Sequence, residues 1–158
     1  MLAWNINGGV PTKLNDAGLQ KTFLEFDVII LLEAKIREKQ TVQLPESLRR
    51  YFTAYNFPRK NNAGGGGILC LIKEEKWKAK MSTPRSRISG TMELVIDIAV
   101  AGTTHSRKDG QRTYKPLKIW GVYLPPEGSH QTTAQEERQA IVQGLGPLII
   151  QDEENIHR

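Results

Sequence analysis

The sequence has little cysteine and no long apolar run, and each of these absences excludes a class of protein. Cys70 is the single cysteine among 158 residues, so a fold held together by internal disulfides is excluded. No apolar run reaches the roughly 20 residues of a membrane-spanning helix. The N-terminal residues lack the charged segment and apolar core of a secretory signal. We therefore expect an intracellular protein without a membrane anchor, in which Cys70 is a buried, unreactive thiol.

The sequence also lacks a P-loop, although residues 64–67 are four consecutive glycines. A P-loop needs Gly-x4-Gly-Lys-Ser/Thr at the start of a helix. Here the glycines are followed by the apolar segment Ile68-Leu69-Cys70-Leu71-Ile72, which is typical of a buried strand. We interpret the glycines as a hairpin turn or bulge in which glycine supplies positive φ angles.

Charge and composition fit one globular domain with a basic surface. The 22 basic and 17 acidic residues give a net charge of +5, and 39% of the residues are hydrophobic. A polyanionic partner fits this charge, because lysine and arginine gain affinity by releasing counterions from phosphates. Basic residues near Trp77 either follow a phosphate backbone or form a solvated face; they are Lys73, Lys76, Lys78, Lys80, Arg85 and Arg87.

The order of the expected elements is strand, helix, strand, a run of strands, then helix and strand. Apolar patterns predict strands at residues 2–6, 28–32, 51–57, 68–72, 92–100, 117–124 and 147–150. A helix is expected over residues 12–26, a short one near Glu46, and a third from Thr133, whose capping box uses Glu136, to about Leu145. Residues 102–114 read as a hairpin connection. This order predicts a single layered α/β sandwich with mixed strand directions over residues 1–158.

Polar side chains follow two of these strands at the point where each strand ends. Asn5 and Asn7 come at the end of the first strand, and Glu33 directly follows five aliphatic residues. Because burying an unpaired charge is costly, Glu33 either emerges at the sheet edge, pairs with Lys35 or binds a cation. Open α/β sheets bind ligands at the carboxyl edge of their strands. The two asparagines, which precede Gly8, would also suit a simple turn.

Three segments of the chain resemble the endonuclease/exonuclease/phosphatase superfamily of Mg²⁺-dependent phosphodiesterases. They are Trp-Asn-Ile-Asn-Gly at 4–8, Asp-Val-Ile-Ile-Leu-Leu-Glu at 27–33, and Gly-Val-Tyr-Leu-Pro at 121–125. The second segment matches the superfamily motif aspartate-aliphatic-aliphatic-x-Leu-x-Glu. The resemblance implies a DNase I-like fold, here a partial four-layer α/β sandwich with mixed, largely antiparallel sheets.

The resemblance also implies a role for each matched residue. Glu33 and Asn5 would hold Mg²⁺, or Mn²⁺, which takes one or two protein carboxylates and keeps several waters. Asn5, Asn7 and Lys35 would bind substrate, and Tyr123 would contact the scissile phosphate. Without the resemblance, Tyr123 would be a packed aromatic residue in a strand, which is the commoner role of a tyrosine, and Lys35 would be a surface lysine.

The next superfamily motif, Gly-Asp-x-Asn, is degenerate in this chain. The register of the expected strand 147–150 places Glu153 at the aspartate that activates the attacking water, and Asn155 at the asparagine. Glutamate is longer by a methylene, and a misplacement of about 1 Å can cost roughly 10²-fold in rate. The superfamily's terminal Ser-Asp-His would lie beyond Arg158. We therefore expect one domain that is incomplete at its C-terminal end, with impaired activity and self-association through an uncovered sheet.

Within the superfamily, the chain most resembles the endonucleases of non-LTR retrotransposons, which nick target DNA. The prediction is a DNA-nicking, Mg²⁺-dependent endonuclease, which would be nuclear if it derives from a retroelement. An apurinic/apyrimidinic repair endonuclease or another phosphoesterase uses the same scaffold, so both stay open. So does a non-catalytic remnant that at most binds nucleic acid weakly.

Overall fold

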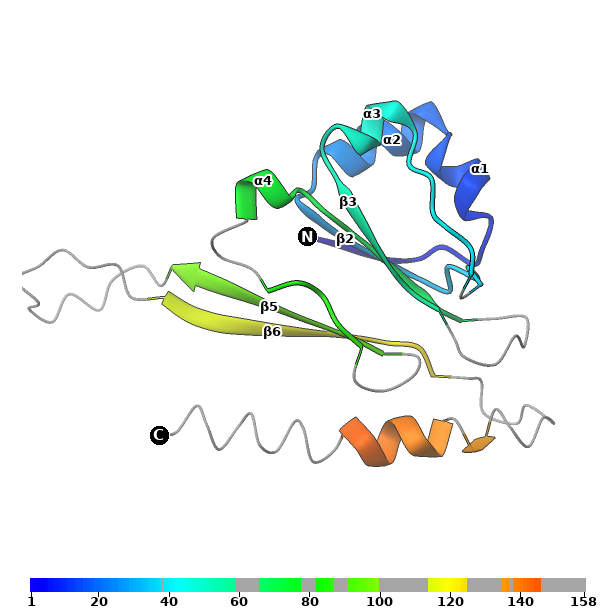
Figure 1. The fold of residues 1–158 in the computed structure, drawn as a ribbon, viewed down its shortest axis with the longest axis vertical. Coiled ribbons are helices and arrows are strands. Elements are labelled where there is room, and N and C mark those ends of the chain that lie inside the picture. The colour runs from blue at the N-terminus through cyan, green and yellow to red at the C-terminus, as the bar shows by residue number, and fades with distance from the viewer. Residues whose placement is uncertain are drawn as a thin grey trace, which may run out of the picture.

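Two stacked sheets and the helices that flank them make up the fold (Figure 1). The computed structural model describes residues 1–37, 39–58, 66–77, 82–86, 91–99, 114–124, 135–136 and 138–145. The strands are β1 (Leu2–Asn5), β2 (Val28–Leu32), β3 (Thr53–Phe57), β4 (Ile68–Ile72), β5 (Thr91–Ala99) and β6 (Tyr114–Val122). The helices are α1 (Val10–Leu14), α2 (Ala17–Leu24), α3 (Glu46–Arg49) and α4 (Glu74–Trp77), and residues 138–145 are also helical.

The first sheet has the strand order β1-β2-β4-β3, and the second pairs β5 with β6 in antiparallel fashion. β1 and β2 run parallel, whereas β4 is antiparallel to both β2 and β3. Asn5 lies opposite Leu32, and Leu32 lies opposite Ile68. The ends of β1 and β2 and the start of β4 therefore meet at one edge of the first sheet, which we call the site edge.

The side chains of β2 alternate between two hydrophobic cores, as expected for a strand buried on both faces. Ile29 and Leu31 face the helices, where they join a core that includes Val10, Leu14, Phe23 and Leu48. Val28 and Ile30 face the second sheet and pack with Met92, Leu94 and Ile96. Helices α1 to α3 cover one face of the first sheet, the second sheet covers the other, and residues 138–145 lie beyond it (Figure 1). The predicted layered α/β fold is confirmed.

The two sheets approach each other closely at Gly121 in β6. A Cβ atom there would lie 3.1 Å from Met92 Cε and 3.3 Å from Ile68 Cδ1. Since Ile68 begins β4 beside the site edge, the contact places the last residues of β6 at that same end of the sandwich. Figure 1 shows β6 ending at the end of the molecule where β2 ends and β4 begins.

The prediction of one continuous helix over residues 12–26 is wrong. The structure has two helices, α1 and α2, with Asn15 and Asp16 between them. Asp16 adopts an extended conformation, and its Oδ1 accepts a hydrogen bond from the backbone N–H of Leu19 at 2.8 Å. A side-chain cap of this kind starts a new helix. Periodicity of the apolar residues alone does not reveal it, because both helices present apolar residues to the same core.

Other expected boundaries shift by a few residues. The third strand begins at Thr53 rather than at residue 51, because the backbone N–H of Tyr51 still bonds to the carbonyl of Leu48 in the turn after α3. The sixth strand begins at Tyr114, three residues before the expected start. The expected strand at 147–150 lies outside the described residues. In the part of the chain that the structure describes, no helix has the length and apolar character needed to cross a membrane.

Cys70 is buried in the middle of β4, as expected. Burial raises the pKa of its thiol to about 12, because a low-dielectric surrounding disfavours the thiolate. The thiol is therefore protonated and unreactive at neutral pH.

Candidate functional site

Four polar side chains meet at the site edge and form one hydrogen-bonded chain. Asn5 Nδ2 donates to Glu33 Oε1 at 2.9 Å. The backbone N–H of Asn7 donates to Asn5 Oδ1 at 3.0 Å, and Lys35 Nζ donates to Asn7 Oδ1 at 2.7 Å. The parallel pairing of β1 and β2 brings these residues together, although 28 positions separate Asn5 from Glu33 in the sequence. The structure thus joins the predicted residues Asn5, Asn7, Glu33 and Lys35 in a single cluster.

The two hydrogen bonds of Asn5 fix the orientation of its amide group. The oxygen must face the backbone N–H of Asn7, which is a donor, and the nitrogen must face the Glu33 carboxylate, which is an acceptor. Asn5 therefore presents its nitrogen, not its oxygen, to Glu33. Both polar atoms of the Asn5 amide are therefore engaged in hydrogen bonds within the cluster. The role of Asn5 as a direct metal ligand stays a prediction.

Unusual backbone conformations concentrate in the same cluster. Among the described residues, the non-glycine residues with positive φ are Asn7 at 49°, Glu33 at 53° and Lys35 at 54°. Such conformations are uncommon outside glycine, and they gather at functional sites because the surrounding structure must hold them there. The backbone N–H of Gly8 donates to the carbonyl of Glu33 at 2.7 Å and ties the two loops together.

Lys35 reaches Asn7 by passing directly over Gly8. A Cβ atom on Gly8 would lie only 2.9 Å from Lys35 Cδ, and Gly8 has a φ of +71°. Glycine suits this position for two reasons, because a side chain would be strained by the backbone conformation and would also make Lys35 shift. The sequence showed a turn at this glycine but not its contact with a lysine 27 positions later.

Glu33 and Lys35 carry opposite charges but form no ion pair with each other. The Lys35 ammonium bonds to Asn7, and the structure shows no ion pair of Glu33 with any described residue. The expected alternative in which Glu33 pairs with Lys35 is therefore not what the structure shows. Within the described ranges, no three His, Cys, Asp or Glu side chains gather as a potential metal cluster. Of the four side chains in the cluster, Glu33 is the one carboxylate.

One carboxylate suits the metal that the sequence predicts. Mg²⁺ is a hard cation that takes one or two protein carboxylates and completes its coordination with waters and substrate phosphates. Glu33 Oε1 accepts the Asn5 amide, and the half-exposed carboxylate keeps its remaining acceptor capacity on the solvent side. The donor set at this edge therefore fits Mg²⁺ or Mn²⁺.

The other predicted site residues are Tyr123, Glu153 and Asn155. Tyr123 follows the end of β6 and is half-buried. The chain leaves the second sheet here at the end of the sandwich that holds the site edge, because Gly121 lies close to Ile68 at the start of β4. Glu153 and Asn155 lie outside the described residues, so their catalytic roles stay predictions.

Asp27, at the start of the segment that matches the superfamily motif, lies at the opposite end of β2 and has a structural role. Lys76 Nζ bonds to Asp27 Oδ2 at 2.7 Å, and Lys73 Nζ lies 3.8 Å from Asp27 Oδ1. The hydrogen bond from Lys76 is the main cause that lowers the pKa of Asp27. Lys73 also donates to the backbone carbonyl of Leu24 at 2.6 Å. Lys73 and Lys76 thus connect the end of β4 and helix α4 to the end of α2 and the start of β2.

The basic residues around Trp77 are therefore partly explained by the fold. Lys73 and Lys76 hold Asp27, and Arg85 Nε bonds to the buried carboxylate of Glu93 at 2.9 Å. For these three residues the structure favours intramolecular ion pairs over a path along a phosphate backbone. Lys78, Lys80 and Arg87 lie outside the described residues.

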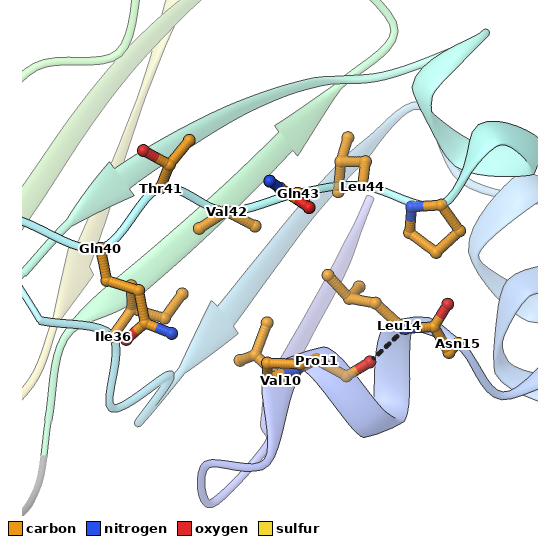
Figure 2. A pocket seen from close by; sticks show the side chains of 11 residues that line it. Val10, Pro11, Leu14, Asn15, Ile36, Gln40, Thr41, Val42, Gln43 and Leu44 are labelled. Carbon is orange, nitrogen blue, oxygen red and sulfur yellow. Dashed lines mark hydrogen bonds between the residues drawn. The ribbon is translucent and has the colours of Figure 1, made fainter.

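A pocket of about 360 Å³ lies next to the cluster, between α1 and the segment 36–45 (Figure 2). Two of its lining residues directly follow the segments that carry the cluster, since Val10 follows Gly9 and Ile36 follows Lys35. Its side chains are apolar or neutral; they are Val10, Pro11, Leu14, Asn15, Ile36, Gln40, Thr41, Val42, Gln43, Leu44 and Pro45. None of these lining residues carries a charge, so the charged side chains Glu33 and Lys35 lie outside the pocket. No sequence motif marks this pocket.

Comparison with known proteins finds similarity at the level of the fold. No protein-family model matches the chain, and no curated protein matches it in sequence. Among solved structures, the chain is similar to the catalytic domain of Xenopus laevis APE2, with a TM-score of 0.57 and 15% identity over 90% of this chain. The chain spans 54% of the length of that domain. The likeness shows a partial DNase I-like fold, in agreement with the expected fold class.

Proposed function

We propose that this chain carries the metal- and phosphate-binding part of a Mg²⁺-dependent phosphodiesterase of the nuclease type. The observation that carries the proposal is the hydrogen-bonded cluster of Asn5, Asn7, Glu33 and Lys35 at the site edge. Ligand sites of α/β sheets lie at the carboxyl ends of strands, and both parallel strands of the first sheet end here. Similarity in fold to a catalytic domain supports the same class of function.

Glu33 is the residue that would hold the cation, Mg²⁺ or Mn²⁺. A cation bound there would polarise a phosphoryl oxygen as a Lewis acid. Asn5 acts as a positioning residue, because its amide nitrogen holds one carboxylate oxygen while its own oxygen is held by Asn7. Outer hydrogen bonds of this kind keep a ligating carboxylate in one orientation.

Lys35 and Asn7 would bind the phosphate of the substrate. The Lys35 ammonium uses one N–H for Asn7 and keeps its other donors for an anion. It stands two positions after Glu33, so a phosphate bridging the cation and the ammonium would meet positive charge from two sides. Tyr123, at the same end of the sandwich, would donate its phenol O–H to the phosphate. Asn155 and Glu153 are proposed for the part of the site that activates water.

DNA is the proposed substrate, and nicking of the retrotransposon type is the proposed reaction. The net charge of +5 favours a polyanion. A protein of this origin would act in the nucleus. Impaired turnover is expected for this chain, because the aspartate position of the Gly-Asp-x-Asn motif holds Glu153.

A supercoiled-plasmid nicking assay tests the proposal. We expect nicking that requires Mg²⁺ and falls by at least about 10²-fold in Glu33→Gln, since metal stabilisation of several kcal/mol is lost and each 1.36 kcal/mol is a factor of ten. Glu25→Gln is the matched control, because Glu25 is an exposed glutamate outside the cluster. Nicking that survives Glu33→Gln would contradict the metal assignment. DNA binding without any Mg²⁺-dependent cleavage would favour the non-catalytic remnant.

A further inference from the structure

The pairing register between the β2 and β4 segments changes directly after β2, at Glu33. Within the strands, Leu32 lies opposite Ile68, so an unbroken ladder would place Glu33 opposite Gly67. Instead, the backbone N–H of Ala34 donates to the carbonyl of Gly67 at 3.1 Å. The backbone N–H of Lys35 donates to the carbonyl of Gly66 at 2.8 Å. The β2 side therefore has one residue more than the β4 side. β2 ends at Leu32 and β4 begins at Ile68, so this offset lies at the strand ends. It resembles a β-bulge, in which Glu33 is the extra residue, and we call it the bulge.

The bulge decides which way the carboxylate lies. Side chains of a regular strand alternate, so Glu33 would follow Ile29 and Leu31 into the core under the helices. Ala34 occupies that core instead and is only 2% exposed. Glu33 is left half-exposed at the edge, where Asn5 reaches it. Without the bulge, the chain would bury an unpaired carboxylate, which is costly.

We propose that Gly66 and Gly67 are positioning residues for the carboxylate of Glu33. Their carbonyls hold the backbone of Ala34 and Lys35, the residues that follow Glu33, and thereby stabilise the positive φ angles of Glu33 and Lys35. Bulges next to functional sites redirect a side chain in this way. The role in metal binding rests on the function proposed above, whereas the role in orienting Glu33 stands without it.

Both glycines adopt backbone conformations that most side chains disfavour. Gly66 has a φ of 88° and Gly67 a φ of 79°. Asparagine tolerates positive φ far better than a β-branched residue does. The pair Gly67→Val and Gly67→Asn therefore separates backbone conformation from the mere presence of a side chain. If Gly67→Val does not fold, Gly67→Ala replaces it as the test variant, because its backbone strain lies between those of valine and asparagine.

Calorimetric titration with Mg²⁺ tests the consequence for metal binding. Gly67→Val is expected to weaken Mg²⁺ binding by about 10- to 100-fold, the usual effect of losing the support of a ligand, with Gly67→Asn closer to the wild type. Leu48→Ala is the stability control, because Leu48 is buried in α3 and lies outside the cluster. It should lower the melting temperature and leave Mg²⁺ affinity unchanged. A Gly67→Val protein that melts earlier but keeps wild-type Mg²⁺ affinity would overturn the proposal.

The side-chain amide signals of Asn5 in an NMR spectrum test the orientation of Glu33 without any metal. We expect Gly67→Val to shift these signals toward the values of Glu33→Gln, because the bond to Glu33 Oε1 is lost, and Gly67→Asn to leave them in place. If the wild-type protein binds no Mg²⁺, the proposed function is refuted. The Asn5 signals would still test the positioning role, because they are measured without metal. Asn5 signals unchanged in Gly67→Val would refute the positioning role, whatever the metal result.

Discussion

At the scale of single residues, the cluster depends on backbone conformations that a sequence pattern does not reveal. The pattern of strand ends predicted that Asn5, Asn7 and Glu33 would be polar groups at one edge, and the structure brings them together with Lys35. The orientation of the Asn5 amide could not be predicted, because it depends on two partners that the fold supplies. Nor could the passage of Lys35 over Gly8, which is a contact between distant loops.

Gly8→Ala should therefore weaken DNA binding more than Gly9→Ala does. Both glycines have positive φ, so both substitutions carry a strain of about 1 kcal/mol or more. Only the Cβ at Gly8 meets Lys35, at 2.9 Å, whereas at Gly9 the nearest contact is Lys13 Cε at 3.8 Å. Fluorescence anisotropy with a short DNA duplex at fixed salt measures the difference. Equal losses in the two variants would mean that Lys35 does not contact the phosphate.

At the scale of helices and strands, local patterns located the elements better than they located the boundaries. Six of the expected strands and the short helix near Glu46 are present within a few residues, because apolar runs and the turn residues between them are local properties. The helix expected over 12–26 is divided, because the cap formed by Asp16 depends on one side-chain hydrogen bond. Asp27 begins the segment that matches the superfamily motif, and the structure shows it paired with Lys76 at the start of β2.

The ion pairs of Asp27 predict a dependence of stability on pH. Lys76 lowers the pKa of Asp27 below its usual value of 3.8, so the stabilisation is present above pH 3.8 and is lost as the pH falls through the lower pKa of the folded state. The effect is below about 1 kcal/mol, because Lys76 is 62% exposed. Asp27→Asn should lower the free energy of unfolding more at pH 7 than at pH 2.5, as measured by urea denaturation. An equal loss at both pH values would contradict the assignment.

At the scale of the whole molecule, the layers and the site have a common origin in the packing of two sheets. The element order predicted a layered sandwich, and the structure confirms it. The register between the sheets could not be predicted, because it depends on the contact of Gly121 with Ile68 and Ile30 of the first sheet. That contact also places Tyr123 at the end of the sandwich where Glu33 lies. The expectation that the domain is incomplete and self-associates stays a prediction.

Gly121→Leu should destabilise the molecule by about 1–3 kcal/mol, the usual cost of overpacking a core. The added side chain would meet Met92 Cε, Ile68 Cδ1 and Ile30 Cγ2, which lie 3.1, 3.3 and 3.6 Å from an ideal Cβ. Leu117→Ala is the control on the same strand, since Leu117 is 42% exposed, and it should change stability by roughly 0.5 kcal/mol or less. Chemical denaturation compares the two. A tolerated Gly121→Leu would show that the sheets are less closely packed than described.

The central claim is that Glu33, oriented by Asn5, holds a divalent cation at the site edge. The most direct test is paramagnetic broadening of backbone amide signals by substoichiometric Mn²⁺, with Mg²⁺ as competitor. We expect the signals of Asn7, Gly8, Glu33, Ala34 and Lys35 to broaden first, to recover with Mg²⁺, and to stay sharp in Glu33→Gln. Broadening that begins elsewhere, for example around Asp27 and Glu74, or that persists in Glu33→Gln, would contradict the claim.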